Sequence, residues 1–234
     1  MTPSSYPSEP KPSQGERSDR RARWHAYYSE KRIVHQWLQV DLLKSLPVAK
    51  ILEIGPYLGA VTALLSNAGY QVTTLDIEGD RPRHGAVGHI RADVRRLDIA
   101  ALQGFDALLC CETLEHLPFA EVPGVLANFH ATNAPYLILS MPYEGPQLGL
   151  SLYLNSHRWP RFKYFHRFHF RHRFRAPNTD LWESHRWEIG YRDYPLRKLR
   201  RVVEAAGYKI VRTEFTSGTR SVFLVCRRVD HARA

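Results

Sequence analysis

Acidic residues and glycines recur where apolar, strand-like runs of the sequence end. The run 49–54 contains Glu53 and leads directly into Gly55 and Gly59. Glycines are needed where a backbone turns sharply at the carboxyl end of a strand and must approach a ligand without a Cβ in the way. Asp76 ends the next such run, about 20 residues after the loop, a spacing at which an acidic side chain accepts hydrogen bonds from ribose hydroxyls. These residues predict a ligand that contains a ribose.

Further residues restrict the chemical class of this ligand. Glu53 would repel a pyrophosphate but suits a cationic amino-acid group. Ile77 comes directly after Asp76 in the second run, where it can face an adenine ring. Asp93 and Val94 end a third run, where Asp93 can bind the adenine amino group. The dinucleotide fingerprint requires a glycine where this sequence has Tyr57. The pattern therefore disfavours an NAD-dependent dehydrogenase.

The ordered series of these motifs resembles the class I S-adenosylmethionine (SAM)-dependent methyltransferases, particularly the broad type 11 and type 12 group. The resemblance covers roughly 48–228. It implies SAM lying over the ends of the first two strands and methyl transfer by in-line displacement. The residues that it assigns to SAM are Glu53, Gly55, Gly59, Asp76, Ile77, Asp93 and Val94. Tyr57 departs from the pattern, since many members have glycine there.

A second group of residues follows the fourth run, 105–111. The segment Cys111-Glu112-Thr113-Leu114-Glu115-His116 resembles a motif of two metal-dependent branches of the family, the ubiquinone-biosynthesis O-methyltransferases and the small-RNA 3′-terminal ribose 2′-O-methyltransferases. In the RNA enzymes a later histidine completes the site, and His185 is the positional match. Two carboxylates and two imidazoles suit Mg²⁺ or Mn²⁺, which would lower the pKa of an acceptor hydroxyl. The metal hypothesis names Glu112, Glu115, His116 and His185 as ligands.

A metal-free interpretation of the same residues stays open. Glu115 and His116 then only shape the start of a helix, and His185 belongs to the rim of the pocket. In that case His116 or His185 can act as a general base, because imidazole titrates near neutrality. Glu112, at the end of the fourth strand, is placed to touch donor or acceptor. The catalytic candidates are therefore His116, His185 and Glu112.

The elements that must position these residues alternate between strands and helices. Strand-like runs are expected at 49–54, 71–77, 89–94, 105–111, 136–141, 208–215 and 221–226, with helices at 61–67, 120–130 and 195–206. Such alternation predicts an α/β fold with a doubly wound, mostly parallel sheet. The resemblance implies that this Rossmann-like sheet is seven-stranded, with an antiparallel terminal strand. We expect a disordered tail over 1–20, a single domain over 21–234 and a leading helix over 21–46.

An aromatic and basic insertion interrupts this rhythm at about 144–190. Its segment 157–175 contains no acidic residue, and its pattern is neither cleanly helical nor cleanly alternating. Three interpretations stay open: a stacking surface for nucleic acid, a contact with an anionic membrane, or a lid whose aromatic residues pack on the domain. The formal net charge of +10 fits an anionic partner.

The three cysteines form no disulfide framework, and no apolar stretch reaches the roughly 20 residues of a membrane span, so we expect a cytoplasmic protein without a transmembrane segment. The first functional hypothesis is methyl transfer to an oxygen, or with less support a nitrogen, of a small-molecule, glycan or lipid-linked acceptor. The alternatives are a metal-dependent RNA ribose 2′-O-methyltransferase and a non-catalytic nucleotide- or membrane-binding module.

Overall fold

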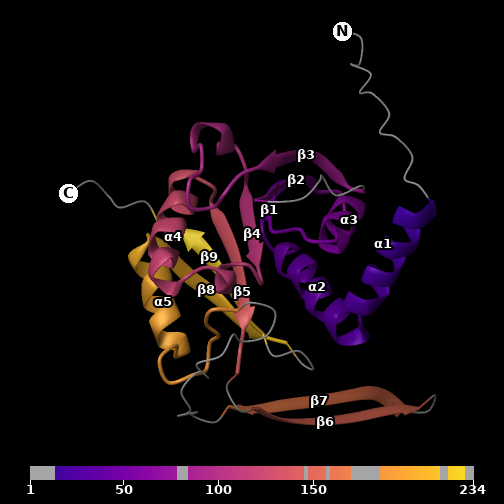
Figure 1. Cartoon of the computed structure of the whole chain (residues 1–234). Helices are drawn as coiled ribbons and strands as arrows, with labels where there is room; N and C mark the ends of the chain where they lie inside the picture. Colours follow the sequence, from indigo (N-terminus) through magenta and orange to yellow (C-terminus); the bar gives the residue numbers. More distant parts are fainter. Residues whose placement is uncertain are drawn as a thin grey trace.

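The computed structural model describes residues 14–77, 84–144, 147–156, 159–169, 185–216 and 221–229. Its centre is a seven-stranded sheet in the order β3-β2-β1-β4-β5-β9-β8. All neighbouring strands run parallel except β9, which is antiparallel to both β5 and β8. Figure 1 shows helices on both sides of this sheet. The predicted doubly wound sheet with one antiparallel terminal strand is confirmed.

The strands of the central sheet are β1 (Lys50–Ile54), β2 (Gln71–Asp76), β3 (Ala86–Arg91), β4 (Ala107–Cys111), β5 (Tyr136–Pro142), β8 (Tyr208–Phe215) and β9 (Ser221–Arg228). The α-helices are α1 (Gln14–Tyr27), α2 (Glu30–Leu43), α3 (Ala60–Asn67), α4 (Val122–Ala131) and α5 (Leu196–Ala205). Short 3-10 helices are η1 (Ala100–Leu102), η2 (Leu114–His116) and η3 (Phe119–Glu121). A separate two-stranded sheet pairs β6 (Gln147–Ser156) with β7 (Trp159–His169).

Alternating side chains of the strands form two cores, one on each face of the sheet. Leu52 and Ile54 of β1 belong to the core under α4 and α5, whereas Ile51 of the same strand belongs to the core under α2 and α3. Both faces of a parallel sheet are buried in this way, which explains the nearly continuous apolar runs of β4 and β5. Cys110 and Cys111 are buried in these cores, on opposite faces of β4.

The leading helix differs from the expected single helix over 21–46. The chain forms two helices, and Ser29 caps the second one by accepting a hydrogen bond at 3.4 Å from the Arg32 N–H. A serine at this position favours a new helix start over continuation, since its hydroxyl satisfies a free backbone donor. Helix α1 begins at Gln14, inside the segment expected to be a tail, while 1–13 lies outside the described residues.

The expected third strand, 89–94, also differs from the structure. Strand β3 covers Ala86–Arg91, so Asp93 and Val94 lie in the turn that follows the strand and not within it. The strand begins earlier because Ala86 pairs with Val72 of β2, ahead of a register shift. The remaining strands lie within a few residues of their predicted positions.

The insertion contains regular structure that its sequence pattern was not expected to give. Strands β6 and β7 pair antiparallel from Gln147↔His169 to Ser156↔Trp159, as a ribbon that Figure 1 shows apart from the central sheet. The residues 145–146, 157–158 and 170–184 of the insertion lie outside the described residues. Among the helices that the structure describes, none is both long and apolar enough to cross a membrane.

Candidate active site

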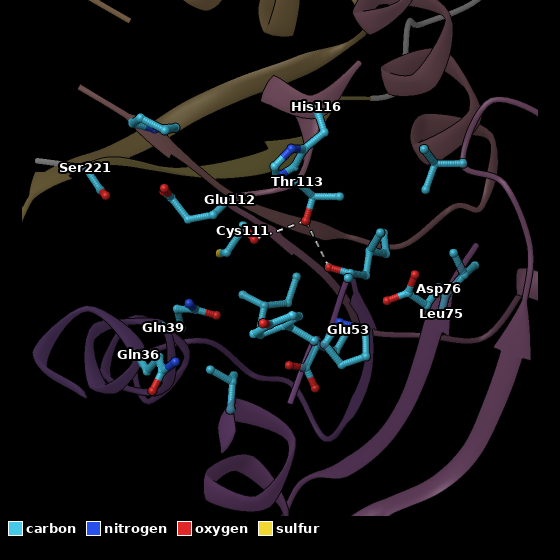
Figure 2. A pocket seen from close by; sticks show the side chains of 18 of the residues that line it. Gln36, Gln39, Glu53, Leu75, Asp76, Cys111, Glu112, Thr113, His116 and Ser221 are labelled. Carbon is cyan, nitrogen blue, oxygen red and sulfur yellow. Dashed lines mark hydrogen bonds between the residues drawn. The ribbon is translucent and has the colours of Figure 1, made fainter. Parts of the chain in front are cut away.

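A cavity of about 880 Å³ lies at the carboxyl ends of β1, β2 and β4. This is the edge at which doubly wound sheets bind their ligands, and the volume lies within the range of small-molecule sites. Figure 2 shows Asp76 on one side of the cavity and Glu112 with Ser221 on the other, with Gln36 and Gln39 of α2 along its wall. The cavity therefore spans from the predicted donor residues to the predicted acceptor residues.

The glycine loop after β1 packs tightly against the loop after β4. Gly55 has a φ of +70°, and a Cβ built on it would lie 2.6 Å from Oγ1 of Thr113. The Thr113 hydroxyl donates to the carbonyl of Cys111 at 3.1 Å and, more weakly, to that of Ile54 at 3.4 Å. Gly55 is therefore required by its conformation and by close packing of two loops, in addition to any approach of a ligand. Gly59 lies outside the cavity lining and caps α3 with a φ of +77°.

Glu53 is buried in the wall of the cavity, at the end of β1. The hydroxyl of Thr62 on α3 donates to Glu53 Oε2 at 2.6 Å. Burial raises the pKa of the Glu53 carboxyl to about 7, and the hydrogen bond from Thr62 opposes this shift only in part. A cationic group entering the cavity would favour the ionised carboxylate and so bind more tightly.

The remaining predicted donor residues also line the cavity. Asp76 ends β2, and Ile77 beside it is 52% exposed, which leaves an apolar side chain free to cover a flat ring. Asp93 is held by the guanidinium of Arg95, with the shortest contact at 2.6 Å, and this hydrogen bonding lowers the pKa of Asp93. A carboxylate has about four acceptor positions, so Asp93 can accept further hydrogen bonds beside those from Arg95. Val94 is buried beside it.

Three of the four predicted metal ligands come together. Glu115, His116 and His185 offer ligand atoms that all lie within 4.8 Å of one another. Two donors bound to one small cation at roughly 2.1 Å each lie at most about 4.2 Å apart, so slight side-chain adjustment closes this group on an ion. Glu115 is completely buried, and both of its carboxylate oxygens lack a hydrogen-bond partner among the described residues. Such a carboxylate is typical of a site that an ion completes.

A further carboxylate, that of Glu188, orients His185. Nδ1 of His185 lies 2.8 Å from Oε1 of Glu188, while its Nε2 lies 3.9 Å from Oε1 of Glu115. A carboxylate that accepts from one ring nitrogen fixes the tautomer and leaves the other nitrogen free to bind a metal or a proton. Glu188 was not among the predicted site residues, although it stands three residues after His185 in the sequence.

Glu112, the fourth predicted ligand, does not belong to this group in the structure. Its Oε1 accepts a hydrogen bond from the hydroxyl of Ser140 at 2.9 Å, and Ser221 provides another hydrogen bond. Its backbone has a φ of +50°, a strained value for a residue with a Cβ. Burial raises the pKa of Glu112 to about 7. The side chain nevertheless lines the same cavity as His116 and His185.

The segment that carries His185 is fixed to the loop after β4. The Arg186 N–H donates to the Glu115 carbonyl at 2.8 Å, and the indole N–H of the fully buried Trp187 donates to the Leu117 carbonyl at 2.9 Å. These hydrogen bonds explain how a residue about 70 positions away in the chain reaches Glu115. The interpretation of the segment as part of the pocket rim and its interpretation as a ligand donor are therefore compatible.

Helix α2 supplies a polar wall that sequence reasoning missed. Its side chains Arg32, His35, Gln36 and Gln39 line the cavity. Gln36 Oε1 and His35 Nε2 are buried without a hydrogen-bond partner among the described residues, and burial lowers the pKa of His35 to about 4. The apolar residues of this helix predicted only that it packs on the core, and Gln36 and Gln39 share a face with the buried Val40 and Leu43. Gln36 and Gln39, three residues apart on one face, were the available signal.

Comparison with solved structures identifies the fold. The chain is similar to a Burkholderia thailandensis 1,6-didemethyltoxoflavin-N1-methyltransferase, with 17% identity, a TM-score of 0.56 and coverage of 95% of this chain and 93% of that one. Magnesium protoporphyrin IX methyltransferase from Synechocystis PCC 6803 matches with 17% identity, a TM-score of 0.54 and 92% coverage of each chain. The methyltransferase domain of a bacterial CtHen1 protein matches with 15% identity, a TM-score of 0.58 and coverage of 85% and 100%.

No family model matches the sequence, and no curated protein matches it either. The structural likeness, at these identities, establishes the fold. The chain has the fold of the class I SAM-dependent methyltransferases, as its sequence motifs indicated.

Proposed function

We propose that this protein is a SAM-dependent methyltransferase that methylates a hydroxyl oxygen. The observation that carries the proposal is a single cavity with two chemically different ends. One end contains Glu53 and Asp76, and the other contains His116 and His185. Of the solved structures to which the chain is similar, the first two were obtained with S-adenosylhomocysteine and with SAM, respectively.

The chemistry of the cavity fits SAM. The carboxylate of Glu53 suits the cationic amino group of a methionine moiety, Asp76 suits ribose hydroxyls, and Ile77 offers an apolar surface for adenine. Gly55, Asp93 and Val94 complete this end, and Gly59 sets the start of α3. When bound, SAM supplies an electrophilic methyl group on a sulfonium.

The residues at the other end would prepare the acceptor. In the transfer an acceptor oxygen forms a bond to the methyl carbon while the carbon–sulfur bond breaks, and the hydroxyl proton must leave. Without a metal, His116 or His185 would take this proton, and Glu188 would hold His185 in the tautomer whose Nε2 accepts it. Glu112 would accept a hydrogen bond from the acceptor or from the donor. The wall of Gln36 and Gln39 would bind polar groups of the acceptor.

We further propose that Mg²⁺ or Mn²⁺ binds Glu115, His116 and His185. Two observations support this assignment: the oxygens of the buried Glu115 have no hydrogen-bond partner in the part of the chain that the structure describes, and the three side chains lie close together. A cation held there would occupy both imidazoles and replace them as the activating group, because it would lower the pKa of an acceptor hydroxyl enough for the proton to leave to solvent. Glu112 would then act beside the cation and not as one of its closest ligands, which modifies the four-ligand hypothesis.

Calorimetric titration with SAM and with S-adenosylhomocysteine tests the proposal. We expect micromolar binding of both by chelator-treated protein, and a change in the binding of an acceptor analogue, not of SAM, when Mn²⁺ is added. Folded protein that binds neither compound would exclude methyl transfer. It would leave the non-catalytic module as the explanation of the fold.

A ribose 2′-hydroxyl of RNA is the second candidate acceptor, beside a small-molecule, glycan or lipid-linked hydroxyl. The gathering of Glu115, His116 and His185 favours it, because their sequence pattern resembles the small-RNA enzymes. Incubation with radiolabelled SAM and an RNA oligonucleotide tests it, with an oligonucleotide methylated at its terminal ribose as the control. Label in the first but not the second would establish RNA as an acceptor.

We propose the cytoplasm as the place of action. All three cysteines are free and buried, which is usual in a reducing compartment.

A further inference from the structure

The β6–β7 ribbon has one face made of exposed apolar side chains. Leu148, Leu150, Leu152 and Leu154 alternate along β6, and each is between 49% and 57% exposed. Residues directly opposite one another in an antiparallel pair share a face. Leu148 pairs with Phe168 and Leu152 with Tyr164, which are 45% and 44% exposed. Isolated exposed leucines are ordinary, but a continuous ladder of this kind marks a binding surface.

The charged residues of the ribbon are all basic. The positions of β7 that alternate with the apolar ones include Arg161, Lys163 and Arg167 in the sequence, and no acidic residue occurs between Glu144 and Asp180. Successive residues of a strand belong to opposite faces. The ribbon thus joins an apolar face to a cationic set of positions, without a negative charge to neutralise it.

We propose that the β6–β7 ribbon docks this protein on the surface of an anionic phospholipid membrane. The leucine face enters the boundary between headgroups and acyl chains, and the arginine and lysine residues contact lipid phosphates. Elements that combine an apolar face with cationic residues bind such interfaces, through buried apolar area and attraction to anionic lipids. The central sheet does not pair with the ribbon, so the ribbon can enter the interface without unfolding the domain.

Two other occupants fit the ribbon less well. Single-stranded nucleic acid binds by stacking bases on aromatic rings. Among the side chains that the structure describes, the face has exposed rings only on its β7 side, as at Tyr164 and Phe168, whereas its β6 side is a ladder of leucines that gives bases nothing to stack on. A second copy of the chain would bring two acid-free, cationic ribbons together, which like-charge repulsion opposes. The leucine ladder thus argues against nucleic acid and the positive charge against a second copy, and an anionic membrane fits both features.

The ribbon leaves the domain beside the cavity. Glu144, just before the ribbon, and His185, after it, both line the cavity. The two chain segments that join the ribbon to the domain are held together at its base by backbone hydrogen bonds. The Ile189 N–H donates to the Pro142 carbonyl at 3.0 Å, and the Glu144 N–H donates to the Ile189 carbonyl at 2.6 Å. A membrane-bound ribbon would accordingly hold the acceptor end of the cavity near the bilayer.

The test is flotation of the full-length protein with vesicles of phosphatidylcholine, with and without phosphatidylglycerol, in the absence of SAM. Wild-type protein should float with the anionic vesicles only, and added salt should weaken the association. Replacing Leu150 by Glu should reduce the partition coefficient about tenfold or more, since burial of one leucine accounts for about a decade of affinity or more. Leu150→Ser should lower it without any change of charge.

Val211→Glu is the matched control. Val211 is a 47% exposed residue of β8, so this variant has the same change of charge in another exposed strand. It should float nearly as wild type does. Equal loss in Val211→Glu and Leu150→Glu would show that total charge alone drives binding, and would overturn the proposal.

Three other results would also overturn it. In the first, wild-type protein floats with neither kind of vesicle. In the second, it binds an RNA oligonucleotide through Leu150 but does not bind vesicles. In the third, light scattering shows a dimer that Leu150→Glu dissociates, and vesicle binding is absent. Calorimetry with SAM on the same variants separates this inference from the proposed methyl transfer. Normal SAM binding without flotation rejects the membrane alone, and flotation without SAM binding rejects the transfer alone.

Discussion

Replacement of Glu115 by Met tests the metal hypothesis through stability, without a known acceptor. Glu115 is fully buried, and its carboxylate oxygens have no hydrogen-bond partner among the described residues. Leaving a buried polar group unpaired costs about 1–3 kcal/mol of folding free energy. Methionine fills a similar volume without that cost. In metal-free protein the Glu115→Met variant should therefore be more stable than wild type by about 1–3 kcal/mol.

Adding Mn²⁺ should reverse this order. A ligand at about 100 times its Kd stabilises the folded state by about 2.7 kcal/mol. For a domain of this size about 1 kcal/mol corresponds to a Tm change of about 2–4 °C. Wild-type protein should thus gain roughly 5–11 °C with saturating Mn²⁺, whereas Glu115→Met should gain almost nothing. Differential scanning calorimetry of chelator-treated protein, with and without the metal, measures both effects.

Glu204→Met provides the control, because Glu204 is an exposed residue of α5 and the change removes the same charge. It should respond to Mn²⁺ as wild type does. The reasoning fails if Mn²⁺ and Mg²⁺ leave the wild-type Tm unchanged while Glu115→Met lowers it. Glu115 would then stabilise the turn that begins η2, as the metal-free interpretation holds.

Three other substitutions address the donor end. Asp76→Ala should weaken SAM binding about 10- to 100-fold in calorimetry, because a hydrogen bond to a charged group contributes about 1.5–3 kcal/mol, while exposed Asp98→Ala should leave it unchanged; equal affinities would remove Asp76 from the site. Gly55→Ala should destabilise the fold more than Gly69→Ala in denaturant unfolding, since both have positive φ but only Gly55 would clash with Thr113; equal losses would contradict the packing argument. Glu53 has a raised pKa in the folded state, so its protonated form stabilises the fold. This contribution is fully present below the unfolded-state pKa of about 4.5 and is lost as the pH rises to about 7. Glu53→Gln should therefore make the free energy of unfolding less dependent on pH over this range. Unfolding at a series of pH values should give a wild-type loss of about 3 kcal/mol from this group, and an equal decline in the variant would assign the effect elsewhere.

The sequence predicted the site best where a residue type has a single common structural role, as glycine has in a sharp turn after a strand. Strand and glycine signals around Ile54 and Gly55 predicted the donor end, because parallel strands must finish at one edge of the sheet. The same rule brought Asp76 and Glu112 to one cavity. The number of strands followed from the resemblance to a known fold, and their order in the sheet was not predicted.

Other features depend on contacts that no local pattern contains. The polar wall of Gln36 on α2 faces the cavity only because the apolar side of the helix packs on the sheet. The pairing of Asp93 with Arg95 is a matter of side-chain conformation, and the approach of His185 to Glu115 requires the buried Trp187. The ribbon is different: the leucines that alternate from Leu148 onward were a strand signal in the sequence, but no strand was predicted there.

The insertion can have a binding role of its own because its base is fixed independently of its strands. Tyr143 and Ile189 form a bridge at that base, and Arg186 and Trp187 bind the loop that contains Glu115. These contacts hold His185 in place whatever the ribbon does. Substitutions in the leucine face should accordingly alter membrane association while the group of Glu115, His116 and His185 keeps its response to Mn²⁺.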